Sequence, residues 1–365
     1  MSRPDDIAFS EKLSPFLRKK CDDLRARLGP YDARYQALVR QYMQSELENA
    51  PAAEANRRHY EADVTVGKGE LPRGVERLYM RTLVIELTIA CAARCRYCLR
   101  QAYEMHTLTE AEIVRVAQFC GSPGLREDVN EALITGGDPF LVPQRLDFLI
   151  ESIMHYAPNI VIIRVATRLP LQDPDRVGDV IFDVFRNKPE IRFEIATQTN
   201  HAVEYFPEVK ECFSRLKEVV PTIYSQNVLL KGVNDNVDAL IELYDTMRVV
   251  GIEPYYLFHA VPLRGTHHFR TSVEKGISLA KRISSSGMFS GRAKPMFAAM
   301  TDIGKITFYE GTILERDRKR NKILLQSYYR FDDRVKWNPS WKLPESTQVD
   351  KDGYLHVWYL DGSDT

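Results

Sequence analysis

The sequence predicts an α/β fold in which six strand–helix units form a partial (β/α)6 barrel, preceded by a helical extension and followed by a small antiparallel β-rich extension. Polar, helix-forming sequence fills about the first 60 residues. From about residue 81, short β-branched or aromatic runs alternate with helical patterns, and closely spaced strand-like runs follow residue 306. We therefore divide the chain into residues 1–80, 81–306 and 307–365.

The N-terminal region predicts helices and shows no chemistry of its own. Apolar residues recur at helical spacing in residues 13–24 and 35–42, and Gly29-Pro30 separates the two stretches. Residues 46–54 are alanine-rich and continue the helical pattern. We expect this region to pack against the main domain or against a partner subunit.

The central region predicts parallel strands joined by helices, with the functional site in the loops at the carboxyl ends of the strands. The predicted strands are Thr82–Leu87, Glu131–Ile134, Ile160–Val165, Arg192–Ile195, Thr222–Val228 and Pro254–Phe258. The predicted helices are Glu110–Cys120, Leu146–His155, Gly178–Phe185, Glu208–Val219 and Asp238–Val249.

The last region predicts an antiparallel sheet. Its strand-like runs, Thr307–Leu314, Ile323–Tyr329 and His356–Leu360, include two that lie too close together for a long crossover. The charged stretch 315–321 is expected to be a solvated hairpin.

Composition excludes several classes of protein. The chain has 50 Lys and Arg residues and 50 Asp and Glu residues, so no overall field favours nucleic acid or an anionic membrane. No apolar run approaches the roughly 20 residues needed to span a bilayer, and the first residues lack the apolar core of a signal peptide. We expect a cytoplasmic protein with no nucleic-acid or membrane partner.

Three of the six cysteines, Cys91, Cys95 and Cys98, lie together directly after the apolar run Leu83–Ala90. A structural zinc site takes four protein ligands, whereas three thiolates leave a metal position open. An iron–sulfur cube held through three of its irons fits this count better than a four-thiolate ferredoxin cluster. Interleaved arginines, Arg94, Arg96 and Arg100, are expected to offset the negative charge.

The cysteine spacing, with Tyr97 before the last thiol, resembles the signature of the radical S-adenosylmethionine (SAM) enzymes. The resemblance implies a [4Fe-4S] cluster on the three cysteines, and cleavage of SAM to a 5'-deoxyadenosyl radical. Thr135-Gly136-Gly137-Asp138 follows a predicted strand, where glycines let the backbone approach a ligand and present amides to it. It resembles the family's glycine-glycine-acid motif, which implies that Gly136, Gly137 and Asp138 contact the SAM amino group.

Further segments resemble lysine 2,3-aminomutase and its relatives over roughly residues 80–310. These are Ile163–Pro170, Gln226–Asp235, Pro254–Tyr256 and His268–Gly276. The resemblance implies a radical 1,2-amino shift assisted by pyridoxal 5'-phosphate (PLP). It places Lys305 as the PLP-binding lysine, which needs a lowered pKa, although the family's glycine-rich loop before it is reduced here to Ile303-Gly304.

The same resemblance assigns the other candidate residues. Arg100 would hold the substrate carboxylate as a bidentate pair, with charge balance beside the cluster as the alternative. Arg81, Arg164 and Thr167 would lie at or near the PLP phosphate. Gln226 and Asn200 would contact SAM, the alternative for both being a buried amide that satisfies backbone at the barrel end.

The substrate is expected to be an amino acid other than free lysine. Lysine-specific members bind the distal ammonium with two aspartates, and the matching positions here are Val261 and Met300. An ammonium buried against these apolar side chains would cost several kcal/mol. Four residues near the first position, His259, Arg264, His267 and His268, would instead suit an acidic or hydroxylated substrate, or have a structural role.

Two other functions remain open. A PLP-independent radical SAM dehydratase or epimerase of a natural-product or sugar substrate, with Lys305 as an acid–base group, would explain the short loop. A non-catalytic metal-binding or nucleic-acid-binding protein that keeps the cluster for structure is disfavoured by the zero net charge and by the open three-cysteine site. As partners, the resemblance implies an electron donor of the flavodoxin or ferredoxin type and a homo-oligomer.

Overall fold

The computed structural model describes residues 10–49, 71–100, 105–263, 265–339 and 341–364. In these residues the chain builds a nine-stranded sheet whose strands follow sequence order from β1 to β9. Strands β2 to β8 pair in parallel, and the edge strands β1 and β9 pair antiparallel with their neighbours. The strands are β1 (Val75–Glu76), β2 (Thr82–Thr88), β3 (Glu131–Gly136), β4 (Ile162–Ala166), β5 (Arg192–Thr197), β6 (Ile223–Leu229), β7 (Glu253–His259), β8 (Met296–Thr301) and β9 (Gly304–Thr307).

The predicted partial barrel is confirmed, and it is one parallel strand larger than expected. All six predicted strands are present as β2 to β7. The additional strand, β8, is the sequence Met-Phe-Ala-Ala-Met-Thr, whose alanines and methionines carry no β-branched signal until Thr301. Its pairing with β7 carries the chain round to the hairpin that contains Lys305.

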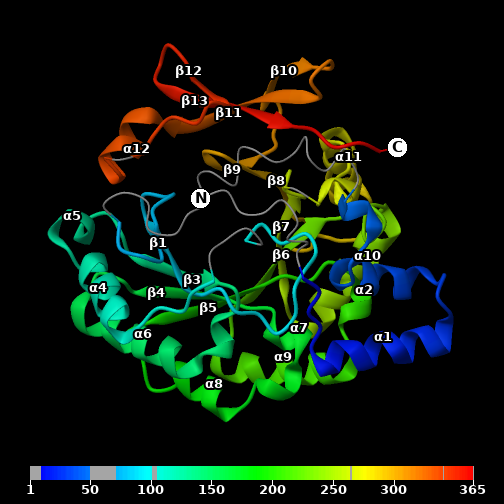
Figure 1. The fold of residues 1–365 in the computed structure, drawn as a ribbon, viewed down its shortest axis with the longest axis horizontal. Coiled ribbons are helices and arrows are strands. Elements are labelled where there is room, and N and C mark those ends of the chain that lie inside the picture. The colour runs from blue at the N-terminus through cyan, green and yellow to red at the C-terminus, as the bar shows by residue number, and fades with distance from the viewer. Residues whose placement is uncertain (1–9, 50–70, 101–104, 264, 340, 365) are drawn as a thin grey trace.

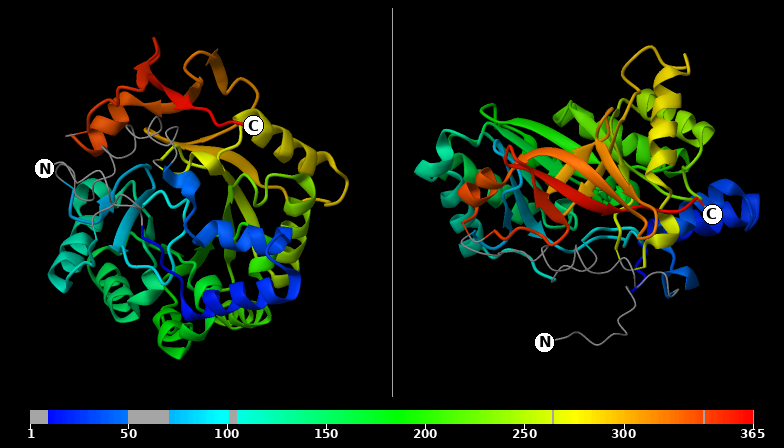
Figure 2. Two further views of the ribbon diagram at one scale, coloured as in Figure 1. Left: turned by 45° about the vertical axis from the view of Figure 1, so that its right-hand side comes forward. Right: turned by 90° about the horizontal axis from the view of Figure 1, so that it is seen from above.

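Helices cover the outer face of the sheet, as Figures 1 and 2 show. The five predicted central helices are confirmed, and each long helix returns the chain to the start of the next strand. The long helices are α4 (Glu110–Cys120), α6 (Pro143–Tyr156), α8 (Asp179–Phe185), α9 (Pro207–Val219), α10 (Val237–Val250) and α11 (Val273–Ser285). Shorter ones are α5 (Pro123–Arg126), α7 (Leu169–Gln172), η3 (Pro139–Leu141), η4 (Pro174–Arg176), η5 (Ala202–Glu204) and η6 (His267–Phe269).

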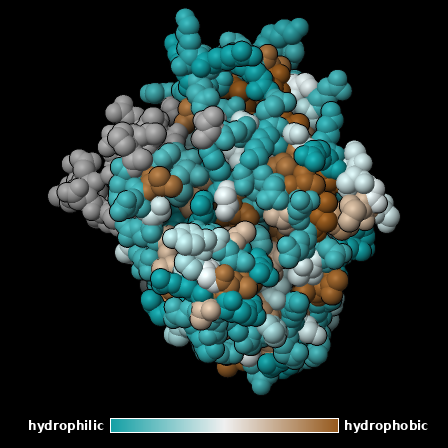
Figure 3. All heavy atoms as spheres, turned by 90° about the vertical axis from the view of Figure 1, so that its right-hand side faces the viewer, coloured by the Kyte–Doolittle hydropathy of each residue, from teal (hydrophilic) through white to brown (hydrophobic). Residues whose placement is uncertain are grey.

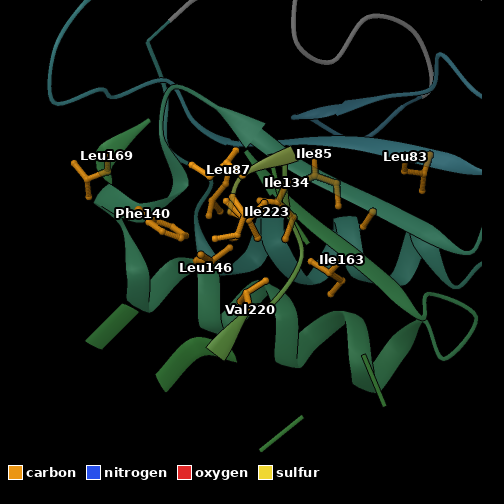
Figure 4. Packing of buried hydrophobic residues seen from close by; sticks show 14 of the residues in the cluster. Leu83, Ile85, Leu87, Ile134, Phe140, Leu146, Ile163, Leu169, Val220 and Ile223 are labelled. Carbon is orange, nitrogen blue, oxygen red and sulfur yellow. The ribbon is translucent and has the colours of Figure 1, made fainter. Parts of the chain in front are cut away.

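The core lies between the sheet and these helices. Alternate residues of β2, Leu83, Ile85 and Leu87, are fully buried and pack with Ile134 and Ile163 of the neighbouring strands (Figure 4). Because side chains alternate along a strand, the residues between them face the barrel interior. Burial on both faces explains why these strands read as continuous apolar runs.

A second sheet follows the barrel, in the order β10-β11-β13-β12 and antiparallel throughout. It confirms the predicted antiparallel extension, and its strands are β10 (Ile313–Asp317), β11 (Lys322–Arg330), β12 (Thr347–Val349) and β13 (Tyr354–Leu360), with α12 (Phe331–Trp337) between them. The predicted strand Thr307–Leu314 is wrong: β9 ends at Thr307 and a turn containing Gly311, at φ +81°, precedes β10. Ile323, Leu325 and Val357 join the barrel core.

The N-terminal segment forms α1 (Pro15–Leu28), α2 (Ala33–Tyr42) and η1 (Glu46–Asn49). Gly29 ends α1 at φ +82° and Asp32 caps α2, so the predicted break is confirmed. The later part of the predicted helical stretch 46–54 lies outside the described residues. Leu17, Leu38 and Tyr42 pack into an apolar cluster that also contains Cys95 and Tyr97, which places this segment beside the cysteine loop.

The face seen in Figure 3 is mostly hydrophilic, with separate hydrophobic patches. Among the described residues, no helix is long and apolar enough to cross a bilayer. The boundaries drawn near residues 80 and 306 stay a prediction.

Candidate functional site

The cysteine loop leaves the carboxyl end of β2 and is held there by the loop that follows β3. Gly137 N donates to Thr88 O at 2.5 Å, and Asp138 N donates to Ala90 O at 2.7 Å. The expectation that this motif presents its amides to a ligand is therefore wrong for these two groups. They fix the backbone that leads to Cys91.

Both glycines of the motif are required by this close approach. A Cβ on Gly137 would lie 2.2 Å from Ala90 O, and one on Gly136 would lie 2.0 Å from Thr88 O, with Gly136 at φ +127°. These neighbours are main-chain atoms, so they can make room for a Cβ only if the cysteine loop is displaced. The part of the motif that the structure explains is thus the placement of the loop, and its contact with SAM stays a prediction.

Gly137→Ala is expected to displace the cysteine loop and to destabilise the fold by roughly 1–3 kcal/mol, because the added methyl group overlaps backbone. Iron bound after anaerobic reconstitution should fall together with the unfolding midpoint. Gly124→Ala is the matched control, since a Cβ there meets nothing within 4 Å. Equal iron content in the two variants would contradict this role of Gly137.

The three thiols lie close enough to influence one another. Burial, followed by the Cys98, Asp138 and Cys95 groups, raises the pKa of the Cys91 thiol, and burial with Cys95 raises the pKa of Cys98 to about 12. As free thiols, Cys91 and Cys98 would stay protonated at neutral pH, so a metal bound there would have to hold them as thiolates. Within the described residues no three His, Cys, Asp or Glu side chains converge on one metal ion. Cysteines of an iron–sulfur cube bind separate irons and need no such convergence.

The sulfur of Cys95 has polar donors around it. Arg168 Nη1 donates to Cys95 Sγ at 2.7 Å, and Gln172 Nε2 approaches it at 3.5 Å. Gln172 also accepts from Ala93 N at 3.1 Å through Oε1, which ties its amide to the loop. Donors aimed at a buried sulfur suit a metal-bound thiolate, so these residues fit the cluster that the sequence predicts.

Arg168 is the charged neighbour that the sequence reasoning missed. The cations expected to balance the thiolates are engaged elsewhere: Arg96 pairs with Glu48, Arg100 pairs with Glu86, and Arg94 donates to Ser10 O. Arg168 lies about 70 residues from the cysteines in sequence, and only the β4–α7 connection brings it back to them. Its presence in Ile163–Pro170 was the available signal.

Asp138 and Thr167, two residues predicted to contact ligands, are hydrogen-bonded to each other. Asp138 is buried, and its carboxylate accepts from Thr167 Oγ1 at 2.8 Å, Arg168 N at 2.7 Å and Phe140 N at 3.0 Å. Burial raises the pKa of Asp138 to about 6 in spite of these bonds. Thr167 therefore lies with Asp138 beside the cysteine loop, and the prediction that it lies near the PLP phosphate is not supported.

Asn200 is fully buried, and its side chain is fully engaged. Its Nδ2 donates to Tyr97 Oη at 2.5 Å and to Gln41 Oε1 at 3.0 Å, and its Oδ1 accepts from Val228 N at 2.7 Å. A contact between Asn200 and SAM stays a prediction, while these bonds give the residue the alternative role. It is the buried amide that satisfies backbone at the barrel end.

A second group of predicted residues lies in the barrel interior around Lys305. The Lys305 ammonium lies 4.0 Å from the centroid of the Tyr256 ring and 5.6 Å from that of Tyr79. Burial, followed by the Arg164 charge, lowers the pKa of Lys305 to about 8. About a fifth of this lysine is thus neutral at pH 7.4, far more than for an ordinary lysine, which favours a covalent PLP site.

Arg164 and Gln226 belong to the same interior group. Arg164 Nη2 lies 2.5 Å from Glu131 Oε1, and its guanidinium lies 5.5 Å from the Tyr224 ring centroid. Gln226 pairs with Tyr256 in the sheet, and it lies two residues after Tyr224, so its side chain points to the same face of β6. Among the described residues, the buried Tyr224 hydroxyl has no hydrogen-bond partner. A nucleophilic lysine, an arginine and an unsatisfied hydroxyl together fit a phosphate-bearing aldehyde.

Arg81 does not join this group. It is exposed before β2, and its Nη1 donates to Asp128 O at 2.9 Å and to Glu127 O at 3.2 Å. These main-chain contacts account for its position, so we leave Arg81 out of the cofactor site.

Arg100 forms an ion pair with the fully buried Glu86 of β2. The alternative was charge balance beside the cluster, whereas the ion pair that the structure shows is with Glu86 of the sheet. A role for Arg100 in binding the substrate carboxylate stays a prediction, and would require its guanidinium to serve two carboxylates.

Some of the residues predicted to contact the substrate side chain are apolar, and others have a structural role. Val261 is buried and Met300 is half-buried beside Lys305 in the β8–β9 pairing. His259 is structural, since its ring lies 2.8 Å from both Tyr359 Oη and Thr271 O, and burial lowers its pKa to about 3. Burial also lowers the pKa of His268 to about 4, and Arg264 lies outside the described residues.

Comparisons with known proteins identify the family. The Radical SAM superfamily model matches residues 85–244. The chain is 30% identical over 277 residues to a protein of Aquifex aeolicus named "Putative L-lysine 2,3-aminomutase", covering 73% of this chain and 71% of that one. It is 26% identical over 230 residues to a glutamate 2,3-aminomutase of Clostridioides difficile, covering 61% of this chain and only about half, 52%, of the relative.

Among solved structures, a radical SAM methyltransferase from Sphaerobacter thermophilus aligns with a TM-score of 0.46 at 16% identity, covering 63% of this chain and 69% of that one. The superfamily implies a [4Fe-4S] cluster and SAM as cofactors. From the match to the Aquifex relative, together with the superfamily match over the cysteine loop, the chain belongs to the radical SAM enzymes and, within them, to the lysine 2,3-aminomutase family.

Proposed function

We propose that this protein is a PLP-dependent radical SAM 2,3-aminomutase that acts on an α-amino acid other than free lysine. The observation that carries the proposal is Lys305, a half-buried lysine whose pKa is lowered to about 8 and which lies against Tyr256 inside the barrel. A structural lysine would lose free energy by burial of its charge, which the contact with the Tyr256 ring offsets only in part, as the lowered pKa indicates. A lysine that must attack an aldehyde has to be neutral, and a lowered pKa favours that neutral form.

Cys91, Cys95 and Cys98 would hold the [4Fe-4S] cluster, which supplies the electron that cleaves SAM. The chain's contribution is to seat the thiols: Gly137 and Asp138 fix the start of the loop, and Arg168 and Gln172 donate toward Cys95. The apolar cluster around Cys95 also contains Tyr256, on whose ring Lys305 rests. The two groups of site residues therefore border one apolar region.

PLP would supply the electronic route by which an amino group moves between neighbouring carbons. In the interior, Lys305 provides the amine, and Arg164 lowers the pKa of that amine. Arg164 is paired with Glu131 and Glu194, so it would have to bind a phosphate in addition to these carboxylates. The Tyr224 hydroxyl is available for a further hydrogen bond. Gln226 lies beside Tyr256 and remains our candidate for a SAM contact.

The substrate side chain is proposed to be neutral or acidic. Val261 and Met300 are apolar and give no counter-charge to a distal ammonium, which would remain costly to bury. A relative named as a glutamate 2,3-aminomutase shows that the family is not restricted to lysine.

One observation favours a second candidate, a PLP-independent radical SAM dehydratase or epimerase. The hairpin before Lys305 is short, and its carbonyls are engaged: Arg334 donates to Ile303 O, and Tyr329 Oη donates to Lys305 O at 3.0 Å. Gly304 adopts φ +118° in this turn, with the Tyr329 ring and Arg334 packed against it. This short turn supplies no glycine-rich loop for a phosphate, so the phosphate would have to be held by Arg164 instead.

Borohydride reduction in the presence of PLP separates the two candidates. We expect a pyridoxyl adduct on Lys305, and a plot of adduct yield against pH with a midpoint near pH 8, because only the neutral amine reacts. Surface lysines, with an ordinary pKa of about 10.4, should label only at higher pH. Peptide mass mapping reads out the site. A protein with an intact cluster and no adduct on Lys305 would exclude the PLP-dependent function.

The proposed partners follow from the proposed chemistry. An electron donor of the flavodoxin or ferredoxin type would reduce the cluster, and an amino acid would be the substrate. We also propose a homo-oligomer in the cytoplasm; all six cysteines are free, as expected in a reducing compartment. Sedimentation of the reconstituted protein as a monomer would contradict the oligomer.

A further inference from the structure

An ion pair lies directly behind the thiol of Cys95. Arg168 Nη2 lies 2.6 Å from Glu204 Oε2, while Nη1 of the same guanidinium donates to Cys95 Sγ at 2.7 Å and to Tyr97 Oη at 2.5 Å. The Arg168 side chain is 11% exposed and that of Glu204 is 2% exposed. Water therefore screens neither charge effectively.

The position of the pair is fixed from several sides. Glu204 Oε1 accepts from Asn200 N at 2.7 Å and from His201 N at 3.1 Å, so the start of η5 holds the carboxylate in place. The Arg168 backbone is held by Asp138, which accepts from its N–H at 2.7 Å. The guanidinium also lies 5.4 Å from the Tyr42 ring centroid, which adds a contact from α2. A guanidinium held this way keeps its direction relative to the sulfur.

We propose that Arg168 is a positioning residue that raises the reduction potential of the cluster on Cys91, Cys95 and Cys98, and that Glu204 limits this effect. The proposal rests on the cluster assignment of the proposed function. Reduction adds one electron from an external low-potential donor and forms no bond to a protein atom. The added negative charge is stabilised by a nearby cation and by an N–H that donates to a ligand sulfur.

Charge and distance give the two residues opposite effects. The guanidinium contacts the sulfur, so its loss makes reduction harder. Glu204 lies on the far side of that guanidinium, and its negative charge opposes the added electron from a greater distance. Removal of the carboxylate charge should therefore make reduction easier, and by a smaller amount.

The test is a redox titration of the reconstituted protein, followed by the electron paramagnetic resonance signal of the reduced cluster. For Arg168→Gln we expect the equilibrium for reduction to become at least tenfold less favourable, a shift of about 59 mV toward lower potential for one electron. For Glu204→Gln we expect a smaller shift toward higher potential. Arg168→Lys, which keeps the charge but changes the donor geometry, should lie between Arg168→Gln and the parent protein.

Two double variants distinguish a change in reduction potential caused by charge from one caused by loss of folding. Arg168→Gln with Glu204→Gln leaves no unpaired buried charge and should still lower the potential, because the lost cation was the nearer group. The matched control is Arg96→Gln with Glu48→Gln, which removes a buried ion pair that also belongs to the cysteine loop. The control is expected to change stability while shifting the potential by less than either Arg168→Gln variant.

The outcomes separate this proposal from the proposed function. Normal iron content with the same potential in the parent protein, Arg168→Gln and Glu204→Gln would overturn the role of Arg168. Shifts of the same sign in Arg168→Gln and Glu204→Gln would also overturn it, because a loosened site would change both in one direction. Failure of the parent protein to bind iron and sulfide would instead overturn the cluster assignment.

Discussion

Replacement of Cys91, Cys95 or Cys98 by alanine is expected to reduce iron binding to background and to abolish reductive cleavage of SAM. Each thiol would bind a separate iron, so the loss of one thiol leaves one iron without its protein ligand. Iron and sulfide content, together with the yield of 5'-deoxyadenosine under reducing conditions, measures the effect.

The chain carries its own controls for this experiment. Cys120 and Cys212 are buried in the barrel core, far from the loop in sequence, and both are free thiols. Cys120→Ala and Cys212→Ala should lose about 1 kcal/mol of stability from packing and keep their iron. SAM cleavage at the parent rate in any of the three loop variants would contradict the cluster assignment.

The second large effect is expected at Lys305. Lys305→Ala should remove the pyridoxyl adduct and lower amino migration by at least about 10²-fold, because the cofactor loses the attachment that positions it. SAM cleavage should persist in part, since the cysteine loop is built without Lys305. Separate assays of 5'-deoxyadenosine and of the amino acid product measure the two effects.

Two further variants show whether the amine itself is needed. Lys305→Arg keeps a cation above the Tyr256 ring but supplies a group that stays protonated, so it should fail as Lys305→Ala does. Lys275→Ala, which removes the half-exposed partner of Asp235, is the control for loss of a lysine elsewhere in the barrel. Unchanged migration in Lys305→Arg would remove covalent attachment from the mechanism.

The fold was predictable because its signals are local. Each parallel strand from β2 to β7 carries a short apolar run, and the central helices carry amphipathic spacing, so both appear within a few residues of sequence. Strand β8 was missed because Ala298, Ala299 and Met300 have low strand propensity, and only pairing with β7 makes them a strand. The hairpin before Lys305 then follows from that strand.

The site was only half predictable, and the reason is physical. The spacing of Cys91, Cys95 and Cys98 lies within one loop and can be read directly. Arg168, Glu204 and Asn200 come from loops after different strands, and a sequence gives no distance between such loops. The same limit applies to Thr167, whose hydroxyl donates to Asp138 beside the cysteine loop.

Charge pairing was the other source of error. The sequence placed Arg94, Arg96 and Arg100 beside the thiols, but the side chains of a loop point in different directions. Arg96 turns to Glu48 in the N-terminal segment, and Arg100 turns to Glu86 in β2. The N-terminal segment, which showed no chemistry of its own, thereby contributes to the shell around the loop, with Lys12 Nζ donating to Cys91 O at 2.6 Å.

The most direct test of the proposed function is the product formed from a mixture of neutral and acidic α-amino acids. The mixture is incubated anaerobically with reconstituted protein, SAM, PLP and a low-potential reductant. The amino acids are then separated, and their masses are determined by mass spectrometry. A 2,3-aminomutase is expected to yield a β-amino acid of unchanged mass from one of them. Formation of 5'-deoxyadenosine with only a dehydrated or epimerised product from a different substrate class, and no β-amino acid, would contradict it.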